Sequence, residues 1–321
     1  MKRFLIQFAL FLLPIVLLAY GLDVFISSNL RRSTQINKGE MTVWSDLYDK
    51  KVNAEVLVMG SSRAWVHLDA TMIADSLHTT AYNLGMDGHN FWMQNFRFGL
   101  AMQQPVKPRV VIQSIDVFTL ARRKDLFYPE QFLPYMLGND SLKKVTQNFA
   151  GYENYDFEVP LIRYYGKGKA VIEAFKIALG GKNEPTRIRG YQGQLIAWTN
   201  EFELAKKRMD HFTVEMDAQT VALFEKYLQF CKASGIRLVF VYSPEYIEGQ
   251  HFIANRTQML DVYRRFSKKY DIPFFDYSNH PISYDRNYFY NALHMNKFGA
   301  EKFTAAFIND LRGLDLGLNQ R

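Results

Sequence analysis

The chain opens with an unbroken apolar segment and then changes to short apolar runs separated by amphipathic stretches. In the first segment, residues 4–22, Gln7 is the only strongly polar side chain, and Asp23 ends the run. At about 1.5 Å per residue, such a helix spans roughly 28 Å, close to the hydrocarbon core of a bilayer. The pattern predicts a membrane anchor within residues 1–27. A cleaved signal peptide with a weak site at Ala19-Tyr20-Gly21 is the alternative.

A polar stretch at 28–52 predicts a stalk, and beyond it the pattern predicts strands that alternate with helices. The strand candidates are apolar runs at 54–59, 79–84, 109–115, 237–242 and 272–275. Helical patterns cover 91–104, 214–233, 253–270 and 297–311. Short apolar strands separated by helices favour a parallel sheet covered on both faces. With right-handed crossovers, we expect an α/β fold: a three-layer α/β/α sandwich around a flavodoxin-like, five-stranded parallel sheet.

Residues 118–212 interrupt this alternation with 16 aromatic side chains and several prolines. We therefore predict one α/β domain, formed by 53–117 and 213–321, that carries a helical insertion at 118–212. The insertion is either a structural element with its own aromatic core or a cap over the active site whose rings stack on sugars. The second interpretation follows from its position after a strand, because ligands bind at the carboxyl ends of parallel strands.

Composition narrows the function classes. The 39 lysines and arginines exceed the 32 aspartates and glutamates by seven, but they are spread along the chain, so we expect no nucleic-acid partner. The single cysteine, Cys231, excludes an intramolecular disulfide framework and CxxC metal sites. The seven histidines show no ligand spacing, so we expect neither a metal nor another cofactor.

Three polar segments follow predicted strands or precede the last helix, where chemistry is expected. Gly60-Ser61-Ser62-Arg63 follows the first strand, and residues 83–90 (Asn-Leu-Gly-Met-Asp-Gly-His-Asn) follow the second. Residues 290–300, which include Asn291 and His294, precede the final helix. A serine at a helix start gains the field of exposed N–H groups, and a histidine can act as a general base. Each segment alone is equally compatible with a cap, a turn or a structural histidine.

Together and in this order, the three segments resemble the SGNH (GDSL-like) serine hydrolase family. The resemblance assigns Ser62 as the nucleophile and His294 as the general base. It places the N–H groups of Ser62 and Gly88 in the oxyanion hole. The motif Asn291-Ala292-Leu293-His294 matches the family's Asp-x-x-His with Asn in place of Asp.

Two departures from the family pattern bear on activity. Asn291 can orient an imidazole but cannot stabilise its cation as a carboxylate does. Asp276 and Asp285 are alternative acids that could reach His294. After the third predicted strand, the family has the motif Gly-x-Asn-Asp, whose Asn donates a hydrogen bond to the oxyanion. This chain has no Asn there and carries Asp116 instead. Losing one such donor typically costs a factor of about 10²–10³ in rate.

Further candidates for substrate contact or support come from the same segments. They are Arg63, which would suit a polysaccharide acceptor or pair at the helix start, and Asn90.

With the anchor, the chain resembles the membrane-anchored branch of the family, which includes alginate-type O-acetylation proteins and D-alanyl transfer proteins. The resemblance implies a serine acyl-esterase or O-acyltransferase on the outer side of the cytoplasmic membrane. It also implies a cell-envelope polysaccharide as substrate and a membrane-bound O-acyltransferase as partner. One alternative is a catalytically impaired binding or assembly subunit of such a system, suggested by Asn291 and Asp116. Another is a phosphate- or nucleotide-binding protein that uses residues 60–62 as an anion cradle, although it lacks the P-loop lysine.

Overall fold

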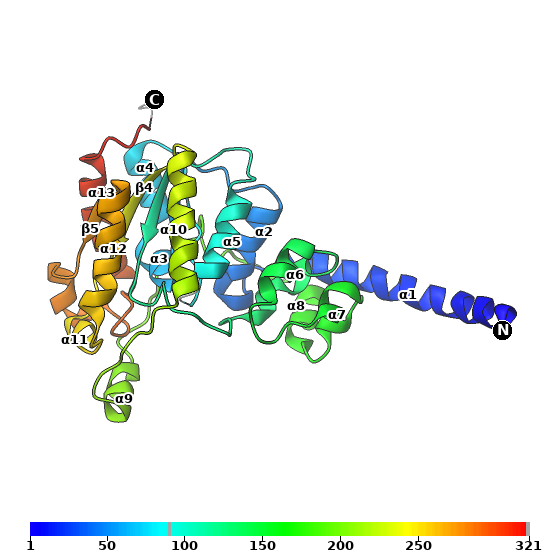
Figure 1. Ribbon diagram of the computed structural model, residues 1–321. Coiled ribbons are helices and arrows are strands. Elements are labelled where there is room, and N and C mark those ends of the chain that lie inside the picture. Colours follow the sequence, from blue (N-terminus) through cyan, green and yellow to red (C-terminus); the bar gives the residue numbers. More distant parts are fainter. Residues whose placement is uncertain (89–90, 319–321) are drawn as a thin grey trace. The chain divides into compact units, whose positions relative to one another are not determined.

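The computed structural model describes residues 1–88 and 91–318, which form two compact units (Figure 1). The helical unit consists of residues 1–45 and 124–186, and the α/β unit consists of residues 46–123 and 187–321. This division differs from the predicted insertion at 118–212. Residues 118–123 and 187–212 belong with the α/β unit, and only the middle of the insertion belongs with the N-terminal helix.

The α/β unit is built on one parallel sheet of five strands in the order β2-β1-β3-β4-β5. The strands are β1 (Val56–Met59), β2 (Ala81–Asn83), β3 (Val110–Ser114), β4 (Arg237–Tyr242) and β5 (Phe274–Asp276). Their side chains are buried in β1 to β3, as expected for a parallel sheet covered on both faces. The predicted three-layer α/β fold with a flavodoxin-like strand order is therefore confirmed. The order reverses at β1, between β2 and β3, and ligands of such sheets bind at this switch point.

Helices cover the two faces of this sheet. One face carries α3 (Ser62–His67), α4 (Ala70–Leu77) and α13 (Lys297–Arg312), whose apolar side chains pack on Val58, Ile112 and Val239. The other face carries α5 (Phe91–Ala101), α10 (Ala218–Ala233) and α12 (Arg256–Tyr270), where aromatic rings around Phe224 and Tyr263 interlock. Shorter elements complete the unit: α9 (Glu201–Arg208), α11 (Ile247–His251), η4 (Pro281–Tyr284) and η5 (Arg286–Tyr288).

The helical unit begins with α1 (Lys2–Leu30), which continues beyond the predicted end of the anchor. It is the one helix of the described chain that is long and apolar enough to cross a membrane, with a mean hydropathy of 2.4. Its last turns are part of the folded unit, since Asp23 is buried and accepts two hydrogen bonds of 2.7 Å from the Arg163 guanidinium. The remaining elements are η1 (Ile36–Gly39), η2 (Pro129–Tyr135), α6 (Asp140–Thr146), α7 (Asn154–Glu158), η3 (Ile162–Tyr164) and α8 (Gly168–Ala178).

The predicted stalk at 28–52 is folded along most of its length. Helix α2 (Glu40–Tyr48) occupies much of it, and the boundary between the two units falls inside this helix. Trp44 is fully buried, donates a 2.7 Å hydrogen bond to Gln131 and packs edge-on against Phe132. Residues 28–52 are polar on average, but the spacing of apolar residues in α2 still gives this helix one buried apolar face.

Candidate functional site

A tight turn after β1 brings Ser62 to the start of α3. Gly60 has φ +148°, and a Cβ there would lie 2.7 Å from the Ser114 carbonyl oxygen, so the position requires glycine. Ser61 caps α3, because its hydroxyl accepts a hydrogen bond from the N–H of Arg63. Ser62 is therefore the first residue of the helix, at the carboxyl end of a strand beside the switch point.

The structure brings Ser62 and His294 together across 232 residues of sequence. The Oγ of Ser62 lies 2.7 Å from the Nε2 of His294, which is a hydrogen-bond distance. His294 lies in the segment between η5 and α13, and the ring of Tyr290 stacks on it at 5.4 Å with an interplanar angle of 7°. Tyr290 therefore holds one face of the imidazole.

Asn291 determines which nitrogen of His294 carries the proton. Its side-chain oxygen accepts from the His294 Nδ1 at 3.0 Å and from the backbone N–H groups of His294 and Leu293 at 2.9 and 3.1 Å. An atom that faces two backbone N–H donors must be the amide oxygen, so the ring nitrogen facing it is the protonated one. Nε2 then presents its lone pair to the Ser62 hydroxyl, which is the arrangement of a nucleophile with its general base.

The amide nitrogen of Asn291 has a carboxylate partner that the sequence analysis missed. It donates a 2.9 Å hydrogen bond to the Oε2 of Glu201, the first residue of α9. Glu201 precedes Asn291 by 90 residues and lies in the segment predicted as an insertion, so no motif spacing pointed to it. The site thus consists of a hydrogen-bonded series that runs from Ser62 through His294 and Asn291 to Glu201.

Arg63 lies in the interior, where it supports the site instead of facing a substrate. Its guanidinium forms a buried ion pair with Glu245, bonds the Ser243 carbonyl and lies over the Tyr242 ring at 4.6 Å. Burial has the largest single effect and lowers the pKa of Arg63, but Glu245, Tyr242 and Asp116 together raise it by more, so the net shift is upward. The proposed contact between Arg63 and a polysaccharide is therefore wrong, because its side chain is only 4% exposed.

His67 is a second buried histidine, and it supports the backbone next to His294. Its Nε2 accepts a 2.9 Å hydrogen bond from the N–H of Met295, so its Nδ1–H donates to Ser243 at 2.7 Å. Burial, with the nearby charges of Arg63 and His294, holds the pKa of His67 well below its usual range. The ring is therefore neutral at pH 7 and acts as a structural crosslink between α3 and the segment that carries the base.

The three acidic candidates have other partners. Asp116 accepts hydrogen bonds from the Ser61 hydroxyl at 2.5 Å and from the N–H of Phe118 at 2.7 Å. Asp276 bonds Arg264 and Ser278, and Asp285 caps η5. The expectation that Asp276 or Asp285 reaches His294 is not met, since Asn291 occupies the position at Nδ1.

The glycine-containing segment after β2 packs against α3, which begins at Ser62. The Asn83 side chain donates to the carbonyls of Ala64 and Leu68 and accepts from the N–H of Gly85, which ties this segment to α3. Gly88 follows in a turn with φ +89°. Its role as an oxyanion donor stays a prediction, and Asn90 lies outside the described residues.

Two pockets border the segment that carries His294. One, of about 270 Å³, is mostly apolar and is lined by residues that include Phe118, Phe202, Phe252, Leu293 and, at its polar edge, Glu201 and Asn291. The other, of about 520 Å³, combines Trp198, Arg286 and Asn287 with apolar neighbours.

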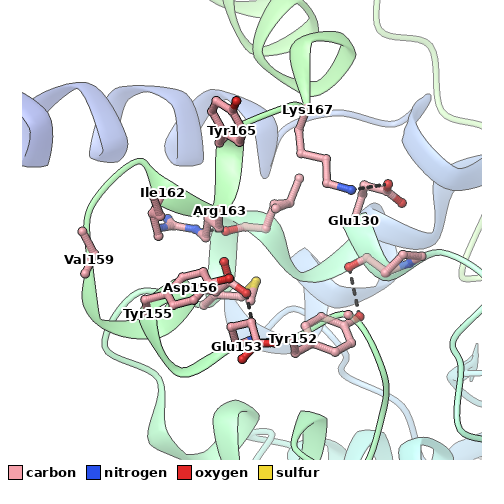
Figure 2. Close-up of a pocket in the computed structure, with 14 residues that line it drawn as sticks. Glu130, Tyr152, Glu153, Tyr155, Asp156, Val159, Ile162, Arg163, Tyr165 and Lys167 are labelled. Atoms are coloured by element: carbon pink, nitrogen blue, oxygen red, sulfur yellow. Dashed lines mark hydrogen bonds and ion pairs between the residues drawn. The ribbon is translucent and has the colours of Figure 1, made fainter.

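A third pocket, of about 590 Å³, lies in the helical unit, and three tyrosines of the predicted insertion, Tyr152, Tyr155 and Tyr165, line it (Figure 2). Within its lining, Lys167 bonds Glu130 at 2.9 Å, and Tyr152 donates to the Pro129 carbonyl at 3.1 Å. No Ser–His pair lies in its lining, which is described in full. The chemistry therefore concentrates at Ser62 and His294 in the α/β unit.

The part of the chain that the structure describes holds no group of three histidine, cysteine, aspartate or glutamate side chains that could bind a metal ion.

Comparisons with known proteins gave remote likenesses among solved structures alone. No protein-family model matches the chain, and no curated protein matches it. Among solved structures, a crystal structure of a proposed acylhydrolase from Bacteroides fragilis NCTC 9343 aligns with 83% of this chain and 95% of its own, at 11% identity and a TM-score of 0.39. At this distance the likeness carries no functional argument.

Proposed function

We propose that this protein is a membrane-anchored serine acyl-esterase or O-acyltransferase of the SGNH type that acts on cell-envelope polysaccharide outside the cytoplasm. The observation that carries the proposal is the pairing of Ser62 Oγ with the unprotonated nitrogen of His294 at 2.7 Å. The anchoring of the other ring nitrogen by Asn291 supports it, because a general base needs a fixed tautomer.

In the proposed reaction, Ser62 attacks the carbonyl carbon of an ester while His294 takes the hydroxyl proton at Nε2. The developing oxyanion would receive hydrogen bonds from the N–H groups of Ser62 and Gly88. Collapse of the tetrahedral intermediate breaks the bond to the leaving alcohol, which takes the proton from His294 and leaves an acyl-serine. Water or a sugar hydroxyl then attacks this ester and gives its proton to His294. Collapse of the second intermediate breaks the bond between the acyl carbon and Ser62 Oγ, which takes the proton back from His294, and the acyl group leaves as an acid or as a new ester.

Glu201 supplies a negative charge that acts on His294 through the Asn291 amide. The neutral amide alone orients the imidazole but leaves its transient positive charge without a counter-ion. A carboxylate that accepts from the amide nitrogen polarises the amide, so that its oxygen becomes a better acceptor for the Nδ1–H of His294. We therefore assign Glu201 as a positioning residue that acts through Asn291.

Two pockets that are lined by sequence neighbours of His294, and not by His294 or Ser62 themselves, suit the two halves of an acyl transfer. The apolar pocket next to Leu293 would hold the acyl group, since aromatic and aliphatic walls bind alkyl chains. The pocket with Trp198, Arg286 and Asn287 offers an aromatic surface, a cation and amide groups, which are the side chains that bind a sugar with an anionic substituent. These features support a polysaccharide acceptor, and the resemblance to the membrane-anchored branch supports a membrane-bound O-acyltransferase as partner.

Helix α1 supports the anchor in this proposal. Its apolar residues up to Leu22 are largely exposed, whereas Asp23, Ile26, Ser27 and Leu30 pack into the helical unit. A helix whose last turns are part of a folded unit is better suited to a retained anchor than to a leader that is removed. The extracytoplasmic orientation rests on the family resemblance alone.

Labelling with a fluorophosphonate and turnover of an activated acetyl ester test the proposal. Ser62→Ala and His294→Ala should each abolish turnover, and Ser62→Ala should also abolish labelling. Ser234→Ala, an exposed serine at the end of α10, and His251→Ala, an exposed histidine, are the matched controls and should keep wild-type rates. Turnover that survives both site changes would exclude the proposed chemistry. Absence of labelling and turnover in the folded wild type would favour the non-catalytic binding or assembly subunit.

A further inference from the structure

Helix α8 carries two apolar stripes on opposite sides, and only one of them is covered. Ala170, Ala174 and Ile177 face the interior of the helical unit. Ile172 and Phe175 lie on the other side of the helix, with Leu179 at its end, and they are 69%, 42% and 86% exposed. At about 100° of rotation per residue, these three side chains fall within one narrow stripe. A stripe of large apolar side chains facing water is unfavourable, so its exposure points to a partner.

The exposed stripe is continuous with the surface of the anchor helix. The ring of Phe175 contacts the ring of Phe25 in α1 at 5.2 Å, and both side chains stay more than a third exposed. The exposed apolar residues of α1 therefore join the stripe on α8 without a polar break at this contact. Whatever covers the end of α1 also reaches α8.

The depth of this contact along α1 identifies the environment. The apolar span ends at Leu22, and the buried Asp23–Arg163 ion pair marks the first polar layer. Phe25 follows within the next turn, so α8 packs against α1 at the level where a membrane span ends. This level is the interface between the hydrocarbon core and the headgroups.

Charged side chains beside the stripe match that interface. Lys169 and Lys176 lie on α8 next to the exposed apolar stripe and are themselves exposed, and Lys176 also forms a 3.4 Å ion pair with Glu173 on the same helix. Lysine side chains at the edge of an apolar helix face reach outward to phosphate groups while their methylenes stay in the apolar layer. Tyr165, just before α8, is 89% exposed, and tyrosine is enriched at this depth of a bilayer.

We propose that α8 lies in the membrane interface, with Ile172, Phe175 and Leu179 inserted among the upper acyl chains and Lys169 and Lys176 at the phosphates. The occupant of the stripe is thus the lipid bilayer itself. This inference rests on the membrane anchoring in the proposed function and adds a second, parallel contact with the same membrane. The helical unit would then contact the bilayer through two helices, α1 and α8, instead of through α1 alone.

The test uses the full chain in lipid nanodiscs with an environment-sensitive dye on an introduced cysteine. Cys231 is buried, and burial raises the pKa of its thiol to about 12, so the dye reacts with the introduced position. The variants are Leu179→Cys and Ile172→Cys on α8, and Leu12→Cys in the middle of α1. The dye coupled to a small soluble thiol supplies the reference for full exposure to water.

We expect the emission of both α8 probes to shift to shorter wavelength and to be quenched by lipids brominated near the headgroup end of the chain. Emission at the water wavelength without quenching would overturn the inference. The emission could also be shifted without being quenched by brominated lipid, and return to the water value when the protein is diluted among empty discs. That result would assign the stripe to a second copy of the chain and would also overturn the inference. The Leu12→Cys probe reports the anchor separately, because only a spanning helix brings it to bromines deep in the bilayer.

Discussion

The carboxylate of Glu201 and the amide nitrogen of Asn291 lie 2.9 Å apart, and this contact fixes the amide with its oxygen toward His294. In the SGNH family that the sequence resembles, a single aspartate stands next to the histidine, whereas here Asn291 and Glu201 are hydrogen-bonded in series beside His294. Because Asn291 supplies the donor and Glu201 the charge, the two positions are expected to depend on each other.

The first prediction exchanges the roles of these two positions. Asn291→Asp alone puts a second carboxylate against Glu201, and two unit charges about 3 Å apart in water-like screening repel by roughly 1.4 kcal/mol, a factor of about ten. Adding Glu201→Gln replaces the repulsion with an N–H donor to the introduced carboxylate. We therefore expect the kcat/KM for an activated ester to be about tenfold higher in the double variant than in Asn291→Asp alone.

The double variant should also exceed the wild type, because a carboxylate stabilises the imidazolium better than an amide does. Glu203→Gln, two residues along α9, is the matched control for the loss of charge and should not rescue Asn291→Asp. A single Asn291→Asp variant as active as the double variant would show that Glu201 does not act through residue 291.

The second prediction concerns the buried ion pair beneath the nucleophile. Arg63→Met removes the nearest cation from the buried Glu245 carboxylate, which keeps only the Tyr242 hydroxyl at 2.5 Å and Arg256 at 3.8 Å, and breaking such a pair typically costs about 3–5 kcal/mol of folding free energy. Arg63→Met combined with Glu245→Leu removes both charges and should recover a large part of that loss. Chemical denaturation of the full chain in detergent measures the free energy of unfolding of the single and double variants. The same substitutions at the half-exposed pair of Arg109 and Glu55 are the control. Equal stability of the single and double variants would contradict this account.

The fold was predictable because its signals are local and repeated. Each strand is a short apolar run with a clear stop, and Gly60 shows how a stop is also a turn that only glycine can make. The family resemblance named Ser62 and His294 together, and the structure brings their side chains to 2.7 Å; only Ser62 follows from the rule that ligands bind at the carboxyl ends of parallel strands, because His294 lies in the segment before α13.

The parts that sequence reasoning missed depend on contacts between distant segments. Glu201 is a polar residue at the start of an exposed helix, and nothing in its local pattern distinguishes it from Glu203 beside it. Arg63 was assigned to a possible surface because arginine is usually exposed, whereas its partner Glu245 lies 182 residues away. Residues 28–52 were predicted only as a stalk, because their average polarity hides the buried face that contains Trp44.

The third prediction tests the attachment of α1 to the helical unit. Asp23 and Arg163 form a buried, doubly hydrogen-bonded ion pair, so Asp23→Ala should destabilise the helical unit by about 3–5 kcal/mol. Faster proteolysis within residues 124–186 of the nanodisc-bound protein reports this loss. Glu158→Ala, which breaks the solvent-exposed pair with Lys143 in the same unit, should cost no more than about 1 kcal/mol. Equal protease sensitivity of the two variants would show that the ion pair does not secure α1.

The fourth prediction is a pH dependence of stability that originates at His67. Folded His67 resists protonation because it is buried and its Nε2 accepts from Met295, whereas an unfolded histidine titrates near pH 6.5. Below about pH 6.5, His67 therefore binds a proton in the unfolded chain but not in the folded chain, so a lower pH favours unfolding. The stabilising effect of the neutral ring is complete above about pH 6.5 and is lost as the pH falls below that value toward the folded pKa. The expected slope is at most about 1.4 kcal/mol per pH unit for this one proton.

Denaturant titrations at pH 7.5 and 5.5 measure the effect. His67→Gln should be less stable than the wild type at pH 7.5 but should lose less stability on acidification. His251→Gln removes an exposed histidine and should keep the wild-type pH dependence. His280, whose pKa is also lowered by burial, contributes a smaller part of the same trend, so some dependence should remain in His67→Gln. If His67→Gln and the wild type lose the same free energy of unfolding between these pH values, then His67 is protonated without cost and does not crosslink α3 to the segment that carries His294.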